Sequence, residues 1–159
     1  MKTVITLLAA ASVTCGGLAH AQAPTWEFAA DQDPLTDQPR YIAYVPAPQK
    51  SMLAVACNAG EFRIYASTNY IDVAFGEIRE VTWRVDHEPP VTQTWRNLQS
   101  GGAAIVGEEA LQMARAIESA ASRIVVKSGQ DVREFSTAGS TKAVSQLMEK
   151  CPNELLKSE

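Results

Sequence analysis

The sequence predicts an α+β domain, built as a curved antiparallel sheet or as a small sandwich or barrel of short strands, with two helices and one disulfide. The first observation is a series of short runs in which apolar and polar residues alternate, separated by turn residues. The second is two stretches rich in helix formers, residues 108–121 and 140–151. The third is a pair of cysteines, Cys57 and Cys151, each on the apolar side of its segment.

Residues 1–21 have the features of a secretory signal peptide. Lys2 is followed by an apolar stretch without an acidic residue, and Ala19-His20-Ala21 supplies the small residues that a signal peptidase recognises. We therefore expect cleavage before Gln22, export to the periplasm, and a single mature domain over residues 22–159.

Two other fates of the N-terminus are disfavoured. Lipidation at Cys15 would require a leucine in the preceding tripeptide, which reads Ser12-Val13-Thr14. The apolar stretch is also broken by Gly16 and Gly17 and falls short of the roughly 20 residues that span a bilayer, so we expect no stable membrane span.

Charge and cysteine content limit the possible partners and the compartment. The formal net charge is −4, and removal of Lys2 with the leader would make it −5. No basic patch with interleaved aromatic residues is present, so we expect no nucleic-acid partner. Export would place Cys57 and Cys151 in an oxidising compartment, which favours a disulfide, with two buried free thiols as the alternative.

The mature domain begins with Trp26 and Phe28. Residues 29–40 are polar, with three aspartates and two prolines, and we interpret them as a turn-rich loop. Residues 41–45 and 52–57 are then predicted to be short strands.

A hairpin follows. Residues 58–60 turn the chain, and residues 61–67 pair with the strand before them. Alternation with a period of two gives the pair an inner face of Leu53, Val55, Cys57, Phe62, Ile64 and Ala66, and gives the second strand an outer face of Arg63, Tyr65 and Ser67.

Alternation continues through Ile71, Val73 and Phe75, and then through the strand at residues 77–86. Turns at residues 87–90 and 98–102 separate two further strands. Arg79, Val81, Trp83 and Val85 share one face of the strand at 77–86. Val81, Trp83 and Val85 are predicted to be core, and Thr82, Arg84 and Asp86 on the other face are predicted to be exposed.

The first helix is predicted over residues 108–121, where two leading glutamates complement the positive end of the helix dipole. Its buried stripe is predicted to be Leu111, Ala114, Ile117 and Ala121. Strands at residues 123–127 and 132–137 come before the last helix, whose N-cap is predicted to be Ser140. Val144, Leu147, Met148 and Cys151 follow the helical repeat, so Cys151 should face the strand that ends at Cys57.

Catalytic and metal-binding patterns are weak. His87 is the one histidine left after the leader is removed, and its acidic neighbours adjoin it in a proline turn, so we expect no catalytic triad and no cofactor. A structural transition-metal site would need clustered cysteines and histidines, which the mature sequence lacks.

Two groups of acids leave alternatives open. Asp31, Asp33 and Asp37 could converge on calcium, but the spacing fails the EF-hand pattern, and acids that cap turns are the alternative. A carboxylate pair for glycoside hydrolysis could come from the strand acids Glu77, Glu80, Asp86 and Glu88, although strand edges carry such acids routinely.

Aromatic residues lie in the predicted strands, at Tyr65, Trp83 and Trp95, and Tyr70 follows a turn. Aromatic residues on strands are usually part of the core. Those that face solvent would form a platform for a protein partner or a glycan.

The succession of these features resembles the VasI-like proteins, small exported bacterial proteins associated with type VI secretion. The matching features are Trp26, residues 33–37, Cys57, Tyr65, residues 81–86, Trp95, Phe135 and Cys151. That family has Tyr-Arg-Phe-Asp at the end of a strand, and this chain has Trp83-Arg84-Val85-Asp86. The resemblance implies a periplasmic, β-rich, disulfide-bonded accessory protein, and it carries no catalytic residues.

The sequence therefore predicts a non-enzymatic periplasmic accessory or binding protein whose partner is an envelope protein or the cell wall. The candidate contact residues are Arg84, Asp86 and Tyr65. The alternative is a small envelope hydrolase of glycan or peptidoglycan, or a hydrolase inhibitor, with Asp86 and Glu88 as its best acids. A raised carboxyl pKa in a pocket would favour the hydrolase, and an exposed aromatic patch would favour the binding protein.

Overall fold

The structure is a computed structural model and describes residues 23–67, 74–99 and 101–152. The predicted signal peptide lies outside the described residues, as do Tyr70, Ile71 and Val73. Phe75, the last residue of that predicted strand, lies in a turn and is 70% exposed, so its predicted place in a strand is wrong.

Nine antiparallel strands form one sheet in the order β1-β2-β3-β4-β7-β6-β5-β8-β9, with two helices packed against it. Strands that follow one another in sequence are neighbours in the sheet, except that β4 is separated from β5 and β7 from β8, because β7 pairs with β4. The elements are β1 (Glu27–Gln32), β2 (Pro39–Ala47), β3 (Ser51–Asn58), β4 (Glu61–Ser67), β5 (Ile78–Val85), β6 (Val91–Asn97), β7 (Gly102–Val106), α1 (Glu108–Glu118), β8 (Ile124–Ser128), β9 (Asp131–Phe135) and α2 (Ser140–Lys150).

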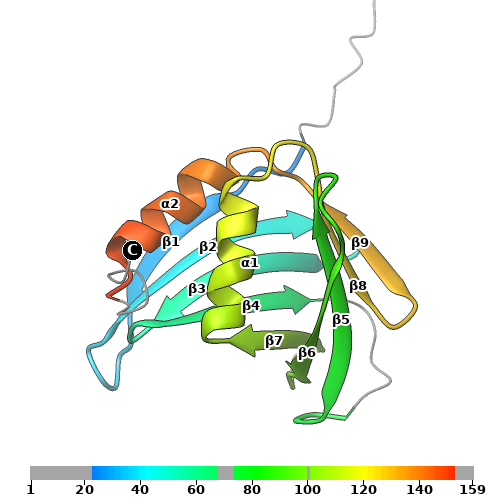
Figure 1. The fold of residues 1–159 in the computed structure, drawn as a ribbon. Coiled ribbons are helices and arrows are strands. Elements are labelled where there is room, and N and C mark those ends of the chain that lie inside the picture. The colour runs from blue at the N-terminus through cyan, green and yellow to red at the C-terminus, as the bar shows by residue number, and fades with distance from the viewer. Residues whose placement is uncertain (1–22, 68–73, 100, 153–159) are drawn as a thin grey trace, which may run out of the picture.

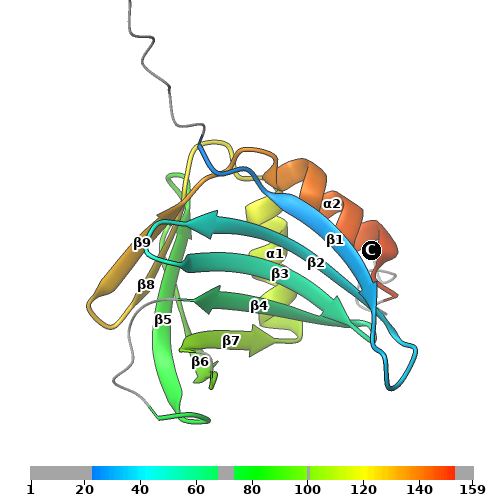
Figure 2. The same ribbon diagram turned by 180° about the vertical axis from the view of Figure 1, so that it is seen from behind.

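The sheet curves around α1, and both helices pack on its concave face (Figure 1). Seen from behind, β1 to β4 and β7 lie in front of the two helices (Figure 2). α1 contacts β4 and β7, α2 contacts β1, β2 and β3, and the two helices contact each other. The core therefore lies between the helices and the concave face, and none of the described elements packs on the convex face.

The predicted inner faces are confirmed. Leu53, Val55, Cys57, Phe62 and Ile64 are fully buried, and the alternation along β4 gives a buried inner face and a half-buried outer face. Burial of these apolar side chains is the main stabilising contribution to the fold.

The predicted disulfide is confirmed. Cys57 at the end of β3 is bonded to Cys151 at the end of α2, with Cα atoms 5.8 Å apart and 94 residues apart in sequence. Val144 and Leu147 of α2 are fully buried, and Cys151 is 6% exposed. The bond holds the last described helix onto the third strand.

A tight turn lies beside this disulfide. Ala59 and Gly60 have φ angles of 50° and 83°, the left-handed backbone that a two-residue β-hairpin turn requires. A Cβ atom on Gly60 would lie 2.9 Å from the carbonyl oxygen of Pro152. Glycine is therefore required here both by the turn and by the close approach of the chain after α2.

The predicted loop at residues 29–40 is wrong at both ends, because residues up to Gln32 belong to the edge strand β1 and Pro39 and Arg40 belong to β2. β1 pairs with β2 from Glu27↔Tyr44 to Gln32↔Pro39. Its last four residues are all exposed, so no alternation of apolar residues marks it as a strand. Trp26 fixes the start of β1, since its indole Nε1 donates to the Ser136 carbonyl at 2.7 Å and its backbone N–H donates to Ala138.

The start of α2 and the end of α1 each differ from the sequence prediction. Gly139, with φ of 80°, is the N-cap of α2, and the predicted cap Ser140 is its buried first residue, whose hydroxyl has no partner among the described atoms. A Cβ on Gly139 would lie 3.0 Å from the Thr25 side chain, so tertiary packing fixes this helix start. α1 ends at Glu118, and Ala121, predicted to be part of its buried stripe, is exposed.

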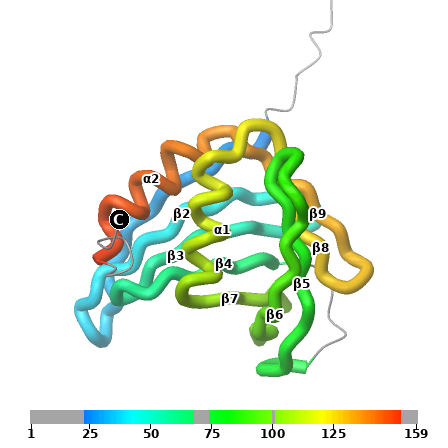
Figure 3. The backbone as a smooth tube through the Cα atoms, viewed as in Figure 1, coloured from blue at the N-terminus to red at the C-terminus, as the bar shows by residue number. Residues whose placement is uncertain are grey.

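The sheet is open, with β1 and β9 at its two edges, so neither the sandwich nor the barrel alternative describes it. Its far half turns back toward the first half, as the backbone path shows (Figure 3). Arg133 of β9 forms an ion pair with Asp131 at 2.8 Å and also donates to the Gln49 side chain in the β2–β3 turn. This contact joins the β8–β9 hairpin to the β2–β3 hairpin, although no backbone ladder pairs these two hairpins.

Candidate functional site

The predicted buried face of β5 is confirmed, because Val81, Trp83 and Val85 are buried. Thr82, Arg84 and Asp86, predicted to be exposed, are half-buried. The Trp83 indole Nε1 donates to the Gln93 side-chain oxygen at 2.7 Å, which gives this buried polar group a partner and fixes the ring.

Asp86, the first residue after β5, binds the chain between α1 and β8. Its carboxylate accepts hydrogen bonds from the backbone N–H groups of Ala121, Ser122 and Arg123 at 2.9, 2.7 and 3.0 Å, and from the Ser122 hydroxyl. Asp86 has a φ of 50°, a conformation that aspartate tolerates better than most residues. The hydrogen bonds, the one from Ala121 above all, hold the pKa of the Asp86 carboxyl well below its usual range.

This lowered pKa bears directly on the hydrolase alternative. A general acid in glycoside hydrolysis must hold its proton near neutral pH, which requires a raised carboxyl pKa. The pKa of Asp86 moves the other way, and its oxygens are occupied by hydrogen bonds within the protein. Asp86 is therefore unsuited to be a general acid, and the arrangement favours a structural role for it.

Asp86 and Glu88 nevertheless lie at the same cavity, which we name the inner groove. It has a volume of about 490 Å³ and runs between α1 and the β5–β6 hairpin on the concave side of the sheet. Its lining consists of Trp83, Val85, Asp86, Glu88, Pro89, Val91, Gln112, Ala116 and Ser119. Most of the wall is apolar, with polar side chains from α1 and two carboxylates at one end.

A second hollow of about 300 Å³, the outer hollow, lies on the convex face. Strand pairing places Tyr65, Ala104, Arg96 and Ile78 in one row across β4, β7, β6 and β5. Ala104 is small and the residues on either side are large, so the row has a depression at its centre. The lining consists of Arg63, Tyr65, Ile78, Thr94, Arg96, Leu98, Ala104, Ile105, Val106 and Glu109.

The two arginine side chains of the outer hollow are held in place by hydrogen bonds. Arg63 donates from its guanidinium to the Glu61 carboxylate, and Arg96 donates to the Gly76 carbonyl at 3.0 Å. Burial alone would lower the pKa of Arg63, but its hydrogen bonds to Glu61 and Tyr65 outweigh that effect and raise it. Ile78 and Val106 add exposed apolar surface, at 64% and 47% exposure.

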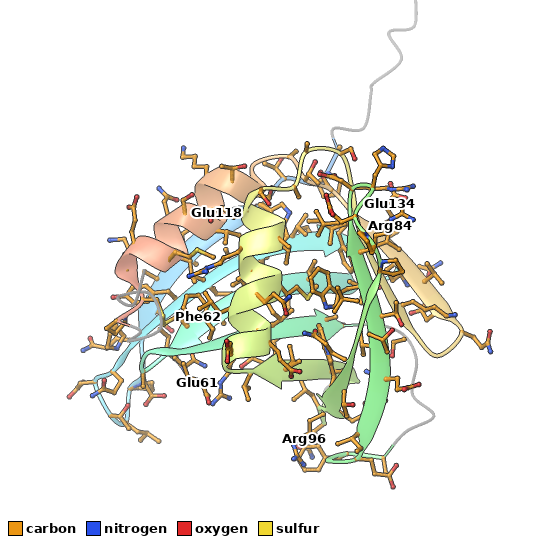
Figure 4. All side chains as sticks on the ribbon, viewed as in Figure 1. Glu61, Phe62, Arg84, Arg96, Glu118 and Glu134 are labelled. Atoms are coloured by element: carbon orange, nitrogen blue, oxygen red, sulfur yellow. A yellow bond between two sulfur atoms is a disulfide. The ribbon has the colours of Figure 1, made fainter. Side chains whose placement is uncertain are left out.

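The structure does not bring the three predicted contact residues together. Tyr65 lies in the outer hollow, whereas Arg84 lies six residues beyond Ile78 along β5, a distance of roughly 20 Å at about 3.3 Å per residue. Arg96 and Arg84 accordingly lie at opposite ends of this part of the sheet (Figure 4). Arg84 donates from Nε to the Asp86 carbonyl at 3.2 Å, so its guanidinium is tied to the same turn.

Sequence reasoning missed the residues that surround Tyr65. The alternation pattern alone predicts that Ile78 and Arg96 lie on the outward face of their strands. Their proximity to Tyr65 could not be predicted from the sequence, because it depends on β7 pairing with both β4 and β6.

The acidic loop at residues 31–37 supports the turn-capping interpretation. The Asp33 carboxylate accepts hydrogen bonds from the backbone N–H groups of Leu35 and Thr36, and Arg40 pairs with Asp31 at 2.9 Å and Asp33 at 3.5 Å. Backbone hydrogen bonds, from Gln32 to Asp31 and from Leu35 to Asp33, are the main cause of the lowered pKa of both carboxyls, and Arg40 contributes to both shifts. Across residues 23–67, 74–99 and 101–152, no group of three or more histidine, cysteine or acidic side chains is arranged to hold a metal ion.

His87 is exposed in the turn between β5 and β6. Neither described helix has the length and apolar character needed to cross a membrane.

Comparison with known proteins gave no match: no protein-family model fits the chain, and no curated protein or solved structure is significantly similar to it.

Proposed function

We propose that this chain is a non-enzymatic exported protein that binds a partner protein of the cell envelope through the outer hollow. The observation that carries the proposal is the convex face, on which none of the described elements packs. Here Tyr65, Arg63 and Arg96 surround a depression with exposed apolar side chains at its rim. Tyrosine and arginine are among the residues most enriched at the energetic centres of protein interfaces.

Two features support export to the periplasm. The sequence of residues 1–21 has the pattern of a signal peptide. The Cys57–Cys151 disulfide is of the kind that persists in oxidising compartments. We also propose an accessory role in type VI secretion, which is supported by the resemblance to VasI-like proteins alone.

The experiment is affinity capture from the native periplasm, followed by identification of the retained protein and measurement of its affinity for variants. Tyr65→Ser and Arg96→Ser each remove a side chain from the outer hollow, and Lys142→Ser removes an exposed charge from α2 as the matched control. Each hollow variant should weaken binding at least tenfold, since truncation of a central interface residue commonly has that effect. Equal affinity of all three variants would contradict the proposal.

The hydrolase alternative has its own test. The purified protein is incubated with peptidoglycan and with soluble glycans, and release of reducing ends is measured. We expect no turnover, because the pKa of Asp86 is lowered and its oxygens are engaged. Turnover that is lost in Glu88→Gln would show that the inner groove is a catalytic site.

A further inference from the structure

The inner groove has the size and lining of a binding site on the side of the molecule opposite the outer hollow. Its volume of about 490 Å³ lies within the range of pockets that hold drug-sized ligands. Trp83, Val85 and Val91 from the β5–β6 hairpin face Ala116 of α1 across it. An apolar chain could therefore lie between the hairpin and the helix.

The apolar wall is preorganised. Trp83 is 5% exposed, and its indole is fixed by the hydrogen bond from Nε1 to Gln93. Val85, also 5% exposed, is held in the paired strand β5, next to β8. A ligand that entered the groove would thus order few side chains on binding, which limits the entropic cost.

The charge at the groove is negative. Both ionisable residues among the nine described lining residues are acids, and no lining side chain is basic. The Asp86 carboxylate accepts hydrogen bonds from the backbone of residues 121–123, whereas Glu88 is exposed. Arg84 and Arg123 donate to the Asp86 carbonyl but do not line the groove.

The end of α1 adds to this negative potential. Ser119, the C-cap of α1, lines the groove, and the C-terminal end of a helix carries a partial negative charge that favours cations. An aromatic wall at Trp83 favours cations as well. The carboxylate of Glu88, the helix end and the indole therefore select the same kind of ligand.

We infer that the inner groove binds a lysine side chain of a partner polypeptide, with the methylenes against Trp83, Val91 and Ala116 and the ammonium near Glu88 and the end of α1. A lysine residue with its flanking peptide groups suits the volume better than an isolated small amine does. The exposed amide of Gln112, at the groove, can form hydrogen bonds with those peptide groups.

The test uses two ligands that differ in one group. Nα-acetyl-lysine methylamide and its norleucine analogue are titrated into the isotopically labelled protein, and backbone amide shifts of Glu88, Ala116 and Ser119 are followed by NMR. The lysine compound should bind about fivefold more tightly than the norleucine compound, and salt should reduce the difference.

Variants test whether the preference for the lysine compound arises at the inner groove. Glu88→Gln removes the charge with little change in shape and should abolish the preference for lysine, whereas Glu149→Gln on α2 should retain it. Ala116→Leu should fill the groove and weaken both ligands. Pentane-1,5-diamine is the third ligand, and it should bind more weakly than the lysine compound.

Several results would overturn the inference. Equal binding of lysine and norleucine compounds would mean that the groove selects apolar chains without regard to charge. A lysine preference that survives Glu88→Gln would place the cation elsewhere. Tighter binding of the diamine would make a free amine, and not a polypeptide side chain, the occupant. Absence of shifts at the groove amides would show that none of these compounds binds there.

Discussion

The disulfide between Cys57 and Cys151 should supply a large share of the stability of this domain. It closes a loop with a sequence separation of 94 residues. In the chain-entropy model, closing a loop of this length removes denatured-state entropy worth about 4.7 kcal/mol at 25 °C. Replacing both cysteines by alanine should therefore lower the free energy of unfolding by about 2 to 5 kcal/mol, the usual range for loss of a native disulfide.

The assay is urea denaturation at pH 7, followed by circular dichroism, of the wild type and the Cys57→Ala/Cys151→Ala variant with and without reductant. Reductant should destabilise the wild type to the level of the variant and should leave the variant unchanged. A difference below about 1 kcal/mol between wild type and variant would refute the argument. So would recovery of two alkylatable thiols from the freshly purified, unreduced protein.

Three further predictions concern β5 and the turn after it. Trp83→Ala should cost roughly 3 to 5 kcal/mol because the ring is buried, whereas Arg84→Ala should cost less than about 1 kcal/mol, and denaturation of both variants checks this. Because folding lowers the pKa of Asp86 from its ordinary value of 3.8, its carboxylate stabilises the fold above that pH and ceases to do so as the pH falls. The melting temperature of Asp86→Asn should thus lie below that of the wild type at pH 7, and the gap should narrow between about pH 4 and pH 2; a constant gap would contradict this. His87→Ala should change neither the melting temperature nor partner binding, since the side chain is exposed in a turn.

The sequence predicted those parts of the fold that a local pattern encodes. Alternation along β3, β4 and β5 marked Leu53, Phe62 and Trp83 as core residues, because a strand with one buried face must alternate. The helical repeat placed Leu147 and Cys151 on the inner side of α2, which made the disulfide predictable.

The features that sequence reasoning missed depend on distant partners. β1 has no alternating pattern, because most of its residues are exposed and its strand conformation comes from pairing with β2. Gly139 replaces Ser140 as the N-cap because Thr25 and Trp26 pack against that turn from the far end of the chain.

The candidate site also depends on contacts between residues that are distant in sequence. Asp86 looked like a surface acid, yet its carboxylate holds the backbone of residues 121–123, some 35 residues away in sequence. The outer hollow depends on β7 lying between β4 and β6, which no local pattern encodes.

The most direct test of the proposed function is site-specific photo-crosslinking in the native periplasm. A photoreactive amino acid is placed at Ile78 or Val106 at the rim of the outer hollow, and at Lys142 on α2 as the control. The account predicts a crosslinked species of defined mass from positions 78 and 106, absent from position 142 and lost when Tyr65→Ser is added. A species formed from position 142 alone, or one from position 78 that persists with Tyr65→Ser, would contradict it.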